Sequence, residues 1–79
     1  MRLTDLHINE TAMITEQDMD RLPAKLVDFG CVPGNVVTVV NYAPFNGPVY
    51  LKVQETYFAV RKEVADFIDV VRFEEKEVA

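Results

Sequence analysis

Apolar and polar positions alternate with two different periods along the chain, and the pattern places one helix among several short strands. Residues 11–15 and 49–54 alternate between small or apolar and polar positions, which is typical of strands with one buried face. We expect three aliphatic side chains of the second run to point inward: Val49, Leu51 and Val53. Residues 36–42 are mostly β-branched and predict another strand, but their pattern does not decide which face is buried.

One segment has helical rather than strand periodicity. Leu22, Leu26 and Phe29 recur at i, i+4 and i+7, so they share one face of a helix that begins near residue 20. Pro23 falls in the predicted first turn, where no amide partner is lost. Gly30 directly follows the last apolar position and predicts a left-handed cap that ends the helix.

Turn-forming residues separate the predicted elements. Residues 32–35 have proline in the second position and glycine in the third, which is the arrangement of a type II turn. Residues 43–48 contain two prolines, an asparagine and a glycine, so they predict a loop between two strands. Both positions therefore reverse the chain and favour antiparallel pairing of the strands on either side.

The second half of the chain predicts a hairpin followed by a short helix and a last strand. Residues 57–61 alternate, with Phe58 and Val60 on the inward face, and they pair with the preceding strand. We expect Glu55 and Thr56 to form the turn, although neither residue favours a positive φ. The remaining predicted elements are a helical turn over residues 62–67 and a strand over residues 68–72.

Short strands with one helix, in a chain of 79 residues, predict a mainly β fold in the form of a small barrel. Closing a sheet hides the edges that would otherwise invite aggregation. A chain of this size has room for a single hydrophobic core. We expect one domain over residues 1–79, with a core from about residue 6 to 72 and an acidic tail over residues 73–79.

Charge and cysteine content restrict the partners and the compartment. Eight lysines and arginines against thirteen acidic residues give a net charge of −5, which opposes binding to nucleic acid. Cys31 is the only cysteine, so no intrachain disulfide can form, and a reducing, cytoplasmic setting fits. The N-terminal residues are followed by no apolar segment, and we expect neither a signal peptide nor insertion into a membrane.

Several phrases of the sequence occur in the order and spacing of a known family. Residues 21–34 contain Arg-Leu, then Asp-Phe-Gly, then Pro-Gly; residues 43–49 contain Ala-Pro and Gly-Pro-Val; residues 58–65 read Phe-Ala-Val-Arg-Lys-Glu-Val-Ala. Residues 68–70 and the opening segment 6–14 agree with the same pattern. Over about residues 6 to 70 the chain resembles the ferrous iron transport protein A (FeoA) family.

The resemblance implies an SH3-like, five-stranded barrel with one or two short helices. It also implies a small cytoplasmic accessory protein of bacterial ferrous iron uptake, located at the inner membrane through its partner. That partner is the membrane ferrous iron transporter with its GTP-binding domain. The same fold occurs as the C-terminal module of iron-dependent repressors, so a metal-sensing or metal-binding domain is the alternative. The resemblance does not decide whether the chain associates with itself.

The chain departs from the family pattern at three places. Asn9 stands where glycine is usual, and Glu55 and Thr56 stand where the family has a glycine-containing turn. The predicted helix also carries fewer basic residues than is usual in the family. These departures affect the expected geometry of the hairpin turn and the expectation of a basic helix face that contacts the partner.

Catalytic and metal-binding residues are sparse. Cys31 and His7 are the only cysteine and histidine, in separate sequence contexts, so an enzyme is the least supported class. Cys31 is best read as a small packing residue, and His7 as a solvated side chain. No two candidate ligands have a close structured spacing, and we predict no cofactor and no metal site. Direct binding of Fe²⁺ by the three glutamates of the tail would be weak: Glu74, Glu75 and Glu77.

Aromatic residues outside the predicted core are the candidates for partner binding. Tyr42, Pro44 and Phe45 lie together at the start of a loop, and Tyr50 and Tyr57 are on the outward positions of the two strands that follow. Exposed aromatic groups are typical anchors of protein interfaces. The alternative is that Tyr42 and Phe45 fold back to plug the end of the barrel.

Overall fold

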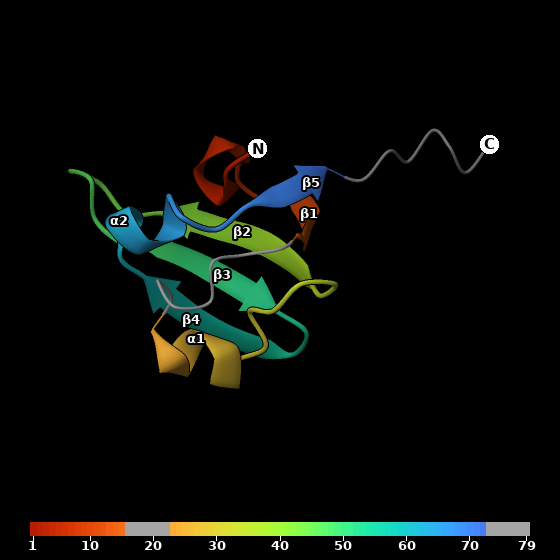
Figure 1. Ribbon diagram of the computed structural model, residues 1–79. Coiled ribbons are helices and arrows are strands. Elements are labelled where there is room, and N and C mark those ends of the chain that lie inside the picture. The colour runs from red at the N-terminus through yellow and green to blue at the C-terminus, as the bar shows by residue number, and fades with distance from the viewer. Residues whose placement is uncertain (16–22, 73–79) are drawn as a thin grey trace.

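Five antiparallel strands form one sheet in the computed structural model, which describes residues 1–15 and 23–72 (Figure 1). The strands are β1 (Thr11–Ile14), β2 (Val36–Tyr42), β3 (Val49–Val53), β4 (Thr56–Val60) and β5 (Val70–Arg72). Their order across the sheet is β4-β3-β2-β1-β5. The described helices are a 3₁₀-helix η1 (Leu3–Asp5), α1 (Ala24–Asp28) and α2 (Lys62–Ala65). The predicted mainly β fold with short helices is confirmed.

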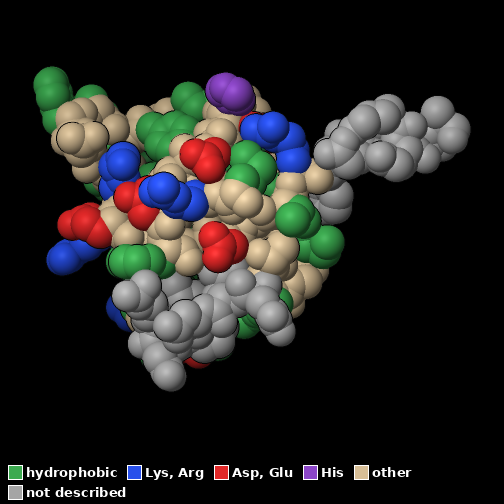
Figure 2. All heavy atoms as spheres, turned by 45° about the horizontal axis from the view of Figure 1, so that its top comes forward, with side chains coloured by type: hydrophobic (Ala, Val, Ile, Leu, Met, Phe, Trp, Pro, Cys, Tyr) green, Lys and Arg blue, Asp and Glu red, His purple; other side chains and the backbone are tan. Residues whose placement is uncertain are grey.

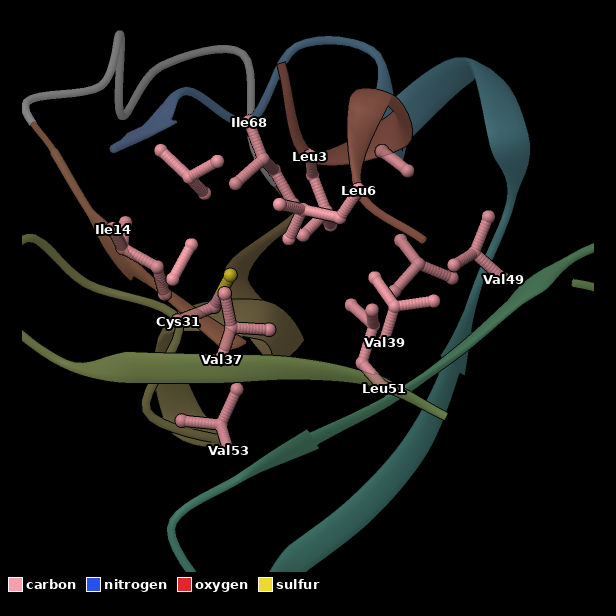
Figure 3. Close-up of a cluster of buried hydrophobic side chains, with 14 of the residues drawn as sticks. Leu3, Leu6, Ile14, Cys31, Val37, Val39, Val49, Leu51, Val53 and Ile68 are labelled. Atoms are coloured by element: carbon pink, nitrogen blue, oxygen red, sulfur yellow. The ribbon is translucent and has the colours of Figure 1, made fainter. Parts of the chain in front are cut away.

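The inward face of the sheet encloses one hydrophobic core (Figure 3). Val37 and Val39 are fully buried because they lie opposite Val53 and Leu51 of β3, which point to the same side. This pairing decides the face of β2 that the sequence pattern left open. Val49, Leu51 and Val53 are buried as predicted. The other members of the core are Leu3, Leu6, Ala12, Ile14, Leu26, Cys31, Val60, Ala65, Ile68 and Val70.

The N-terminal segment contributes to the core although it has no strand or helix periodicity. Leu3, the first residue of η1, and Leu6, which directly follows η1, are both buried. The backbone N–H of Leu3 donates to the carbonyl of Ile68 at 2.8 Å, and Arg2 forms a bridge with Asp69. The first residues are thus held against the segment that leads into β5, and the packed core reaches three residues beyond its expected limit.

The helix α1 is positioned by a cap and a turn that the sequence predicted. Leu26 is the buried residue of α1, and Pro23 precedes the first residue of the helix instead of lying within its first turn. The predicted contribution of Leu22 lies outside the described residues. Gly30 has a φ of 96° and ends the helix, and Gly34 has the same φ in the turn closed by a 3.2 Å bond from Asn35 N–H to the Val32 carbonyl.

Two details of the β3–β4 hairpin correct the sequence expectations. The turn consists of Gln54 and Glu55, one residue earlier than predicted, because Val53 pairs with Thr56. Gln54 has a φ of 55° whereas the φ of Glu55 is not positive, and a positive φ at the first turn position alone is the arrangement of a type II′ turn. Phe58 is half-buried rather than buried, with its ring centroid 4.7 Å from that of Phe29.

The last strand is shorter than predicted. It begins at Val70 instead of Ile68, because Ile68 is buried in the core outside the sheet and its N–H bonds back to Ala65 at 3.1 Å. Within the described residues, β4 and β5 are the two ends of the sheet and do not pair with each other. The structure is therefore a curled sheet, with its core on one side and its other side turned outward.

Candidate functional site

The outward side of the sheet carries a nearly uncharged surface, which we call the outer face. Alternation along the strands, with the irregularity in β2 between Val39 and Asn41, places eleven side chains there: Thr11, Met13, Val36, Thr38, Val40, Asn41, Tyr50, Lys52, Tyr57, Ala59 and Val71. Lys52 is the only charged residue among them, in a chain of which 27% is charged. Figure 2 shows a different side of the molecule, on which acidic and basic side chains are interspersed.

Tyr50 and Tyr57 form the aromatic part of the outer face. Tyr50 pairs with Ala59 and Lys52 pairs with Tyr57, so the two tyrosines are diagonal neighbours on β3 and β4. They are 43% and 67% exposed. A mostly apolar hollow of about 410 Å³, the aromatic hollow, lies beside them and extends to Val40 on β2. The predicted candidates Tyr50 and Tyr57 are thus brought together.

Phe45 stands out at the tip of the β2–β3 loop and is 99% exposed. Phe45 and Asn46 both have a φ of 59°, and the Gly47 N–H closes the turn on the carbonyl of Pro44 at 3.1 Å. Positive φ values at two successive residues other than glycine are uncommon. Phe45 and the exposed Pro44 therefore do not plug the end of the barrel.

Tyr42 has the opposite orientation and is half-buried against the N-terminal segment. Its hydroxyl donates to the carbonyl oxygen of Leu6 and lies 3.4 Å from that of Thr4. Burial raises the pKa of Tyr42, and the carboxylates of Asp5 and Glu10 raise it further. This arrangement favours the alternative in which Tyr42 folds back over the end of the barrel. The role of Tyr42 in partner binding stays a prediction.

Glu10 organises the few polar groups near Tyr42. Its carboxylate accepts the backbone N–H of His7 at 2.9 Å and forms an ion pair with Arg72. The His7 bond is the main reason that the pKa of Glu10 is lowered, and Arg72 adds to the effect. His7 is exposed, with Nδ1 3.4 Å from the Glu10 carboxylate. These contacts join β5 to the residues before β1.

Cys31 lies in the core, apart from the exposed His7. Burial raises the pKa of its thiol to about 11, which disfavours the thiolate that a nucleophile or a metal ligand requires. No group of three His, Cys, Asp or Glu side chains in residues 1–15 and 23–72 could hold a metal ion. The candidate glutamates Glu74, Glu75 and Glu77 lie outside the described residues.

Lys52 is the residue of the outer face that sequence reasoning missed as a candidate. Its Nζ lies 5.6 Å from the centroid of the Tyr57 ring, within the range of a cation–π contact. The signal was present in the alternation of residues 49–54, which turns Lys52 to the same side as Tyr50.

Membrane-spanning helices were not expected from the sequence. None of the helices in the part of the chain that the structure describes is long and apolar enough to cross a membrane.

Comparisons with known proteins agree with this architecture. The model of the FeoA domain family matches residues 1–72. A protein of Porphyromonas gingivalis, named Fe(2+) transport protein A/Fe(2+) transporter FeoB fusion protein, is 32% identical over 71 residues. These residues are 89% of the chain and 8% of that relative, so the chain spans less than a tenth of its length.

Solved structures confirm the SH3-like fold. Stenotrophomonas maltophilia FeoA, solved in complex with zinc and named a prokaryotic SH3 domain protein, is 29% identical with a TM-score of 0.73, covering 90% of this chain and 89% of that one. A manganese-dependent transcriptional repressor is 16% identical with a TM-score of 0.78, covering 92% of this chain and 41% of that one. The second likeness concerns the fold alone.

Proposed function

The chain belongs to the FeoA domain family, and from this we propose that it is a small cytoplasmic accessory protein of bacterial ferrous iron uptake. In this role it binds the membrane ferrous iron transporter through the transporter's GTP-binding cytosolic part. The chain is held at the inner membrane by that partner and does not enter the bilayer itself. It acts by binding and not by catalysis.

The choice of partner is supported by the Porphyromonas gingivalis relative, whose name joins Fe(2+) transport protein A and the transporter FeoB in one fusion protein. Two functions carried on one polypeptide act at the same place, because the linker holds them at a high effective concentration. A separate chain must instead reach the transporter by its own binding surface. The partner of this chain is therefore sought among ferrous iron transporters.

The observation that carries the proposal is the outer face with its exposed aromatic groups. Tyr50, Tyr57 and Phe45 are 43%, 67% and 99% exposed. Aromatic side chains are enriched among the residues that dominate binding energy, and charged residues are depleted from interface centres. The loop that presents Phe45 continues directly into β3, so both parts can contact one partner.

The test is a calorimetric titration of the soluble GTP-binding domain of a ferrous iron transporter with the full chain. We expect saturable binding that Tyr57→Ser or Phe45→Ser weakens by about tenfold, which is the effect of removing an aromatic anchor. Val27→Ser is the matched control, because Val27 is also an exposed apolar residue but lies on α1. Equal losses in all three variants, or no binding at high concentration, would contradict the proposal.

The alternative function, a metal-sensing or metal-binding domain, is supported by the zinc complex of the Stenotrophomonas maltophilia relative. Among the described residues, His7 and Glu10 bring an imidazole and a carboxylate together at 3.4 Å, and Arg72 already neutralises Glu10. Fe²⁺ would therefore bind weakly, as a ligand and not as a resident cofactor. An anaerobic Fe²⁺ titration that shifts the His7 resonances at micromolar metal would favour this alternative, and weak uniform shifts would dismiss it.

A further inference from the structure

Lys52 is the one cation among the described side chains of the outer face, and the others are uncharged. It lies on the outer face between Thr38 of β2 and Tyr57 of β4, its partners in the sheet register. Its side chain is half-buried, and its Nζ lies over the Tyr57 ring at 5.6 Å. Lys52 forms no ion pair with any residue of the described ranges. Within the part of the chain that the structure describes, this ammonium group has no anion to neutralise it when water is displaced.

A second depression, the polar hollow, lies next to Lys52 on the same face. It has a volume of about 380 Å³ and is lined by Gly34, Asn35, Val36, Thr38, Lys52 and Gln54. The Asn35 amide donates to the Gly30 carbonyl at 2.7 Å, and the Thr38 hydroxyl shares a hydrogen bond with Thr11 at 3.0 Å. No acidic residue is among its described lining residues, so the hollow combines one cation with neutral polar groups.

The two hollows have a fixed spacing because β3 contributes to both. Tyr50 belongs to the aromatic hollow and Lys52 to the polar hollow. Residues two apart on one face of a strand are separated by roughly 7 Å. An extended chain laid over the outer face has the same repeat, so its side chains at positions i and i+2 can reach one hollow each.

We propose that the outer face binds an extended segment of the protein partner that carries a large apolar side chain and, two residues away, an aspartate or glutamate. The apolar side chain occupies the aromatic hollow, and the carboxylate pairs with Lys52 in the polar hollow. Burying Lys52 without an anion would oppose binding, and a charge pair across the interface removes that penalty. This inference rests on the proposed function and names the chemistry of the partner.

The primary experiment compares affinities for the transporter's GTP-binding domain. We expect Lys52→Gln to weaken binding by about tenfold or more and Lys52→Arg to retain most of it. Lys25→Gln is the matched control, because it removes the same charge from α1 and should leave the affinity unchanged. Wild-type affinity should fall as salt is added, and Lys52→Gln should lose much of that dependence.

The outcomes separate this inference from the proposed function. Binding by the wild type with equal affinity for Lys52→Gln would overturn the inference alone, whereas no wild-type binding would overturn the proposed function. In that second case the inference is tested with a blocked synthetic peptide that has leucine and glutamate two residues apart. It should shift the amide resonances of Thr38 and Lys52 more than a peptide with glutamine in place of the glutamate. Equal shifts would refute the proposed carboxylate site.

Discussion

At the residue scale, Tyr42 shows how one hydroxyl can join two distant parts of the chain. It donates to the carbonyl of Leu6 and approaches that of Thr4, while its ring lies at the end of β2. We expect Tyr42→Phe to lower the free energy of unfolding by about 1 kcal/mol, because a half-buried carbonyl loses its donor. Urea unfolding measures this, and unchanged stability with weakened partner binding would instead place Tyr42 in the interface.

The buried thiol of Cys31 should make the free energy of unfolding depend on pH in the alkaline range. Its pKa is raised from 9.0 to about 11, so the unfolded chain releases this proton at a lower pH than the folded chain does. The stabilisation from the neutral thiol is complete below pH 9 and is lost as the pH rises toward about 11. Cys31→Ala removes buried volume and should cost about 1 kcal/mol or more near neutral pH.

The size of the Cys31→Ala effect should itself depend on pH. Urea unfolding near neutral pH and at the upper end of this window should show a smaller difference between the variant and the wild type at the higher pH. Tyrosine and lysine titration affects both proteins equally and cancels in the comparison. A difference that is the same at both pH values would show that Cys31 ionises in the folded state as it does in the unfolded state.

At the scale of elements, the two glycines around Pro33, Gly30 and Gly34, differ in how much space surrounds them, so their alanine variants should differ in stability. Both have a φ of 96°, but a Cβ on Gly30 would lie 3.3 Å from Cγ1 of Val53, whereas one on Gly34 would meet nothing within 4 Å. We expect both alanine variants to be destabilised by about 1 kcal/mol, with the larger loss for Gly30→Ala. Thermal or urea unfolding checks this, and a larger loss at Gly34 would contradict it.

The elements with strong local signals could be predicted from the sequence. Val49–Val53 has strict alternation, and Gly30 and Gly34 satisfy backbone conformations that other residues avoid. The buried face of β2 could not be predicted, because valines occupy both faces and the pairing with β3 decides between them. The turn at Gln54 was misplaced by one residue, since its positive φ is imposed by the register and not by its own preference.

At the scale of the whole molecule, the exposed aromatic residues Tyr50, Tyr57 and Phe45 could be proposed from the sequence, but Lys52 and the arrangement of these side chains could not. Tyr42 and Phe45 are near neighbours in the sequence and have opposite environments, because the N-terminal segment offers its carbonyls to the Tyr42 hydroxyl while Phe45 stands exposed. That segment carries no periodicity, so its place over the end of the barrel is a result of tertiary packing. Lys52 became a candidate in the same way, because the sheet register places it among described side chains of the outer face that carry no other charge.

In the proposed function the outer face and the Phe45 loop form the binding surface, and the core serves only to hold them. The most direct test of this proposal is a titration of the ¹⁵N-labelled chain with the soluble GTP-binding domain of a ferrous iron transporter, followed residue by residue. We expect the perturbed amides to lie in β2, β3, β4 and the loop around Phe45, while those of α1 and η1 stay unchanged. Perturbations concentrated on α1, or none at any concentration, would contradict it.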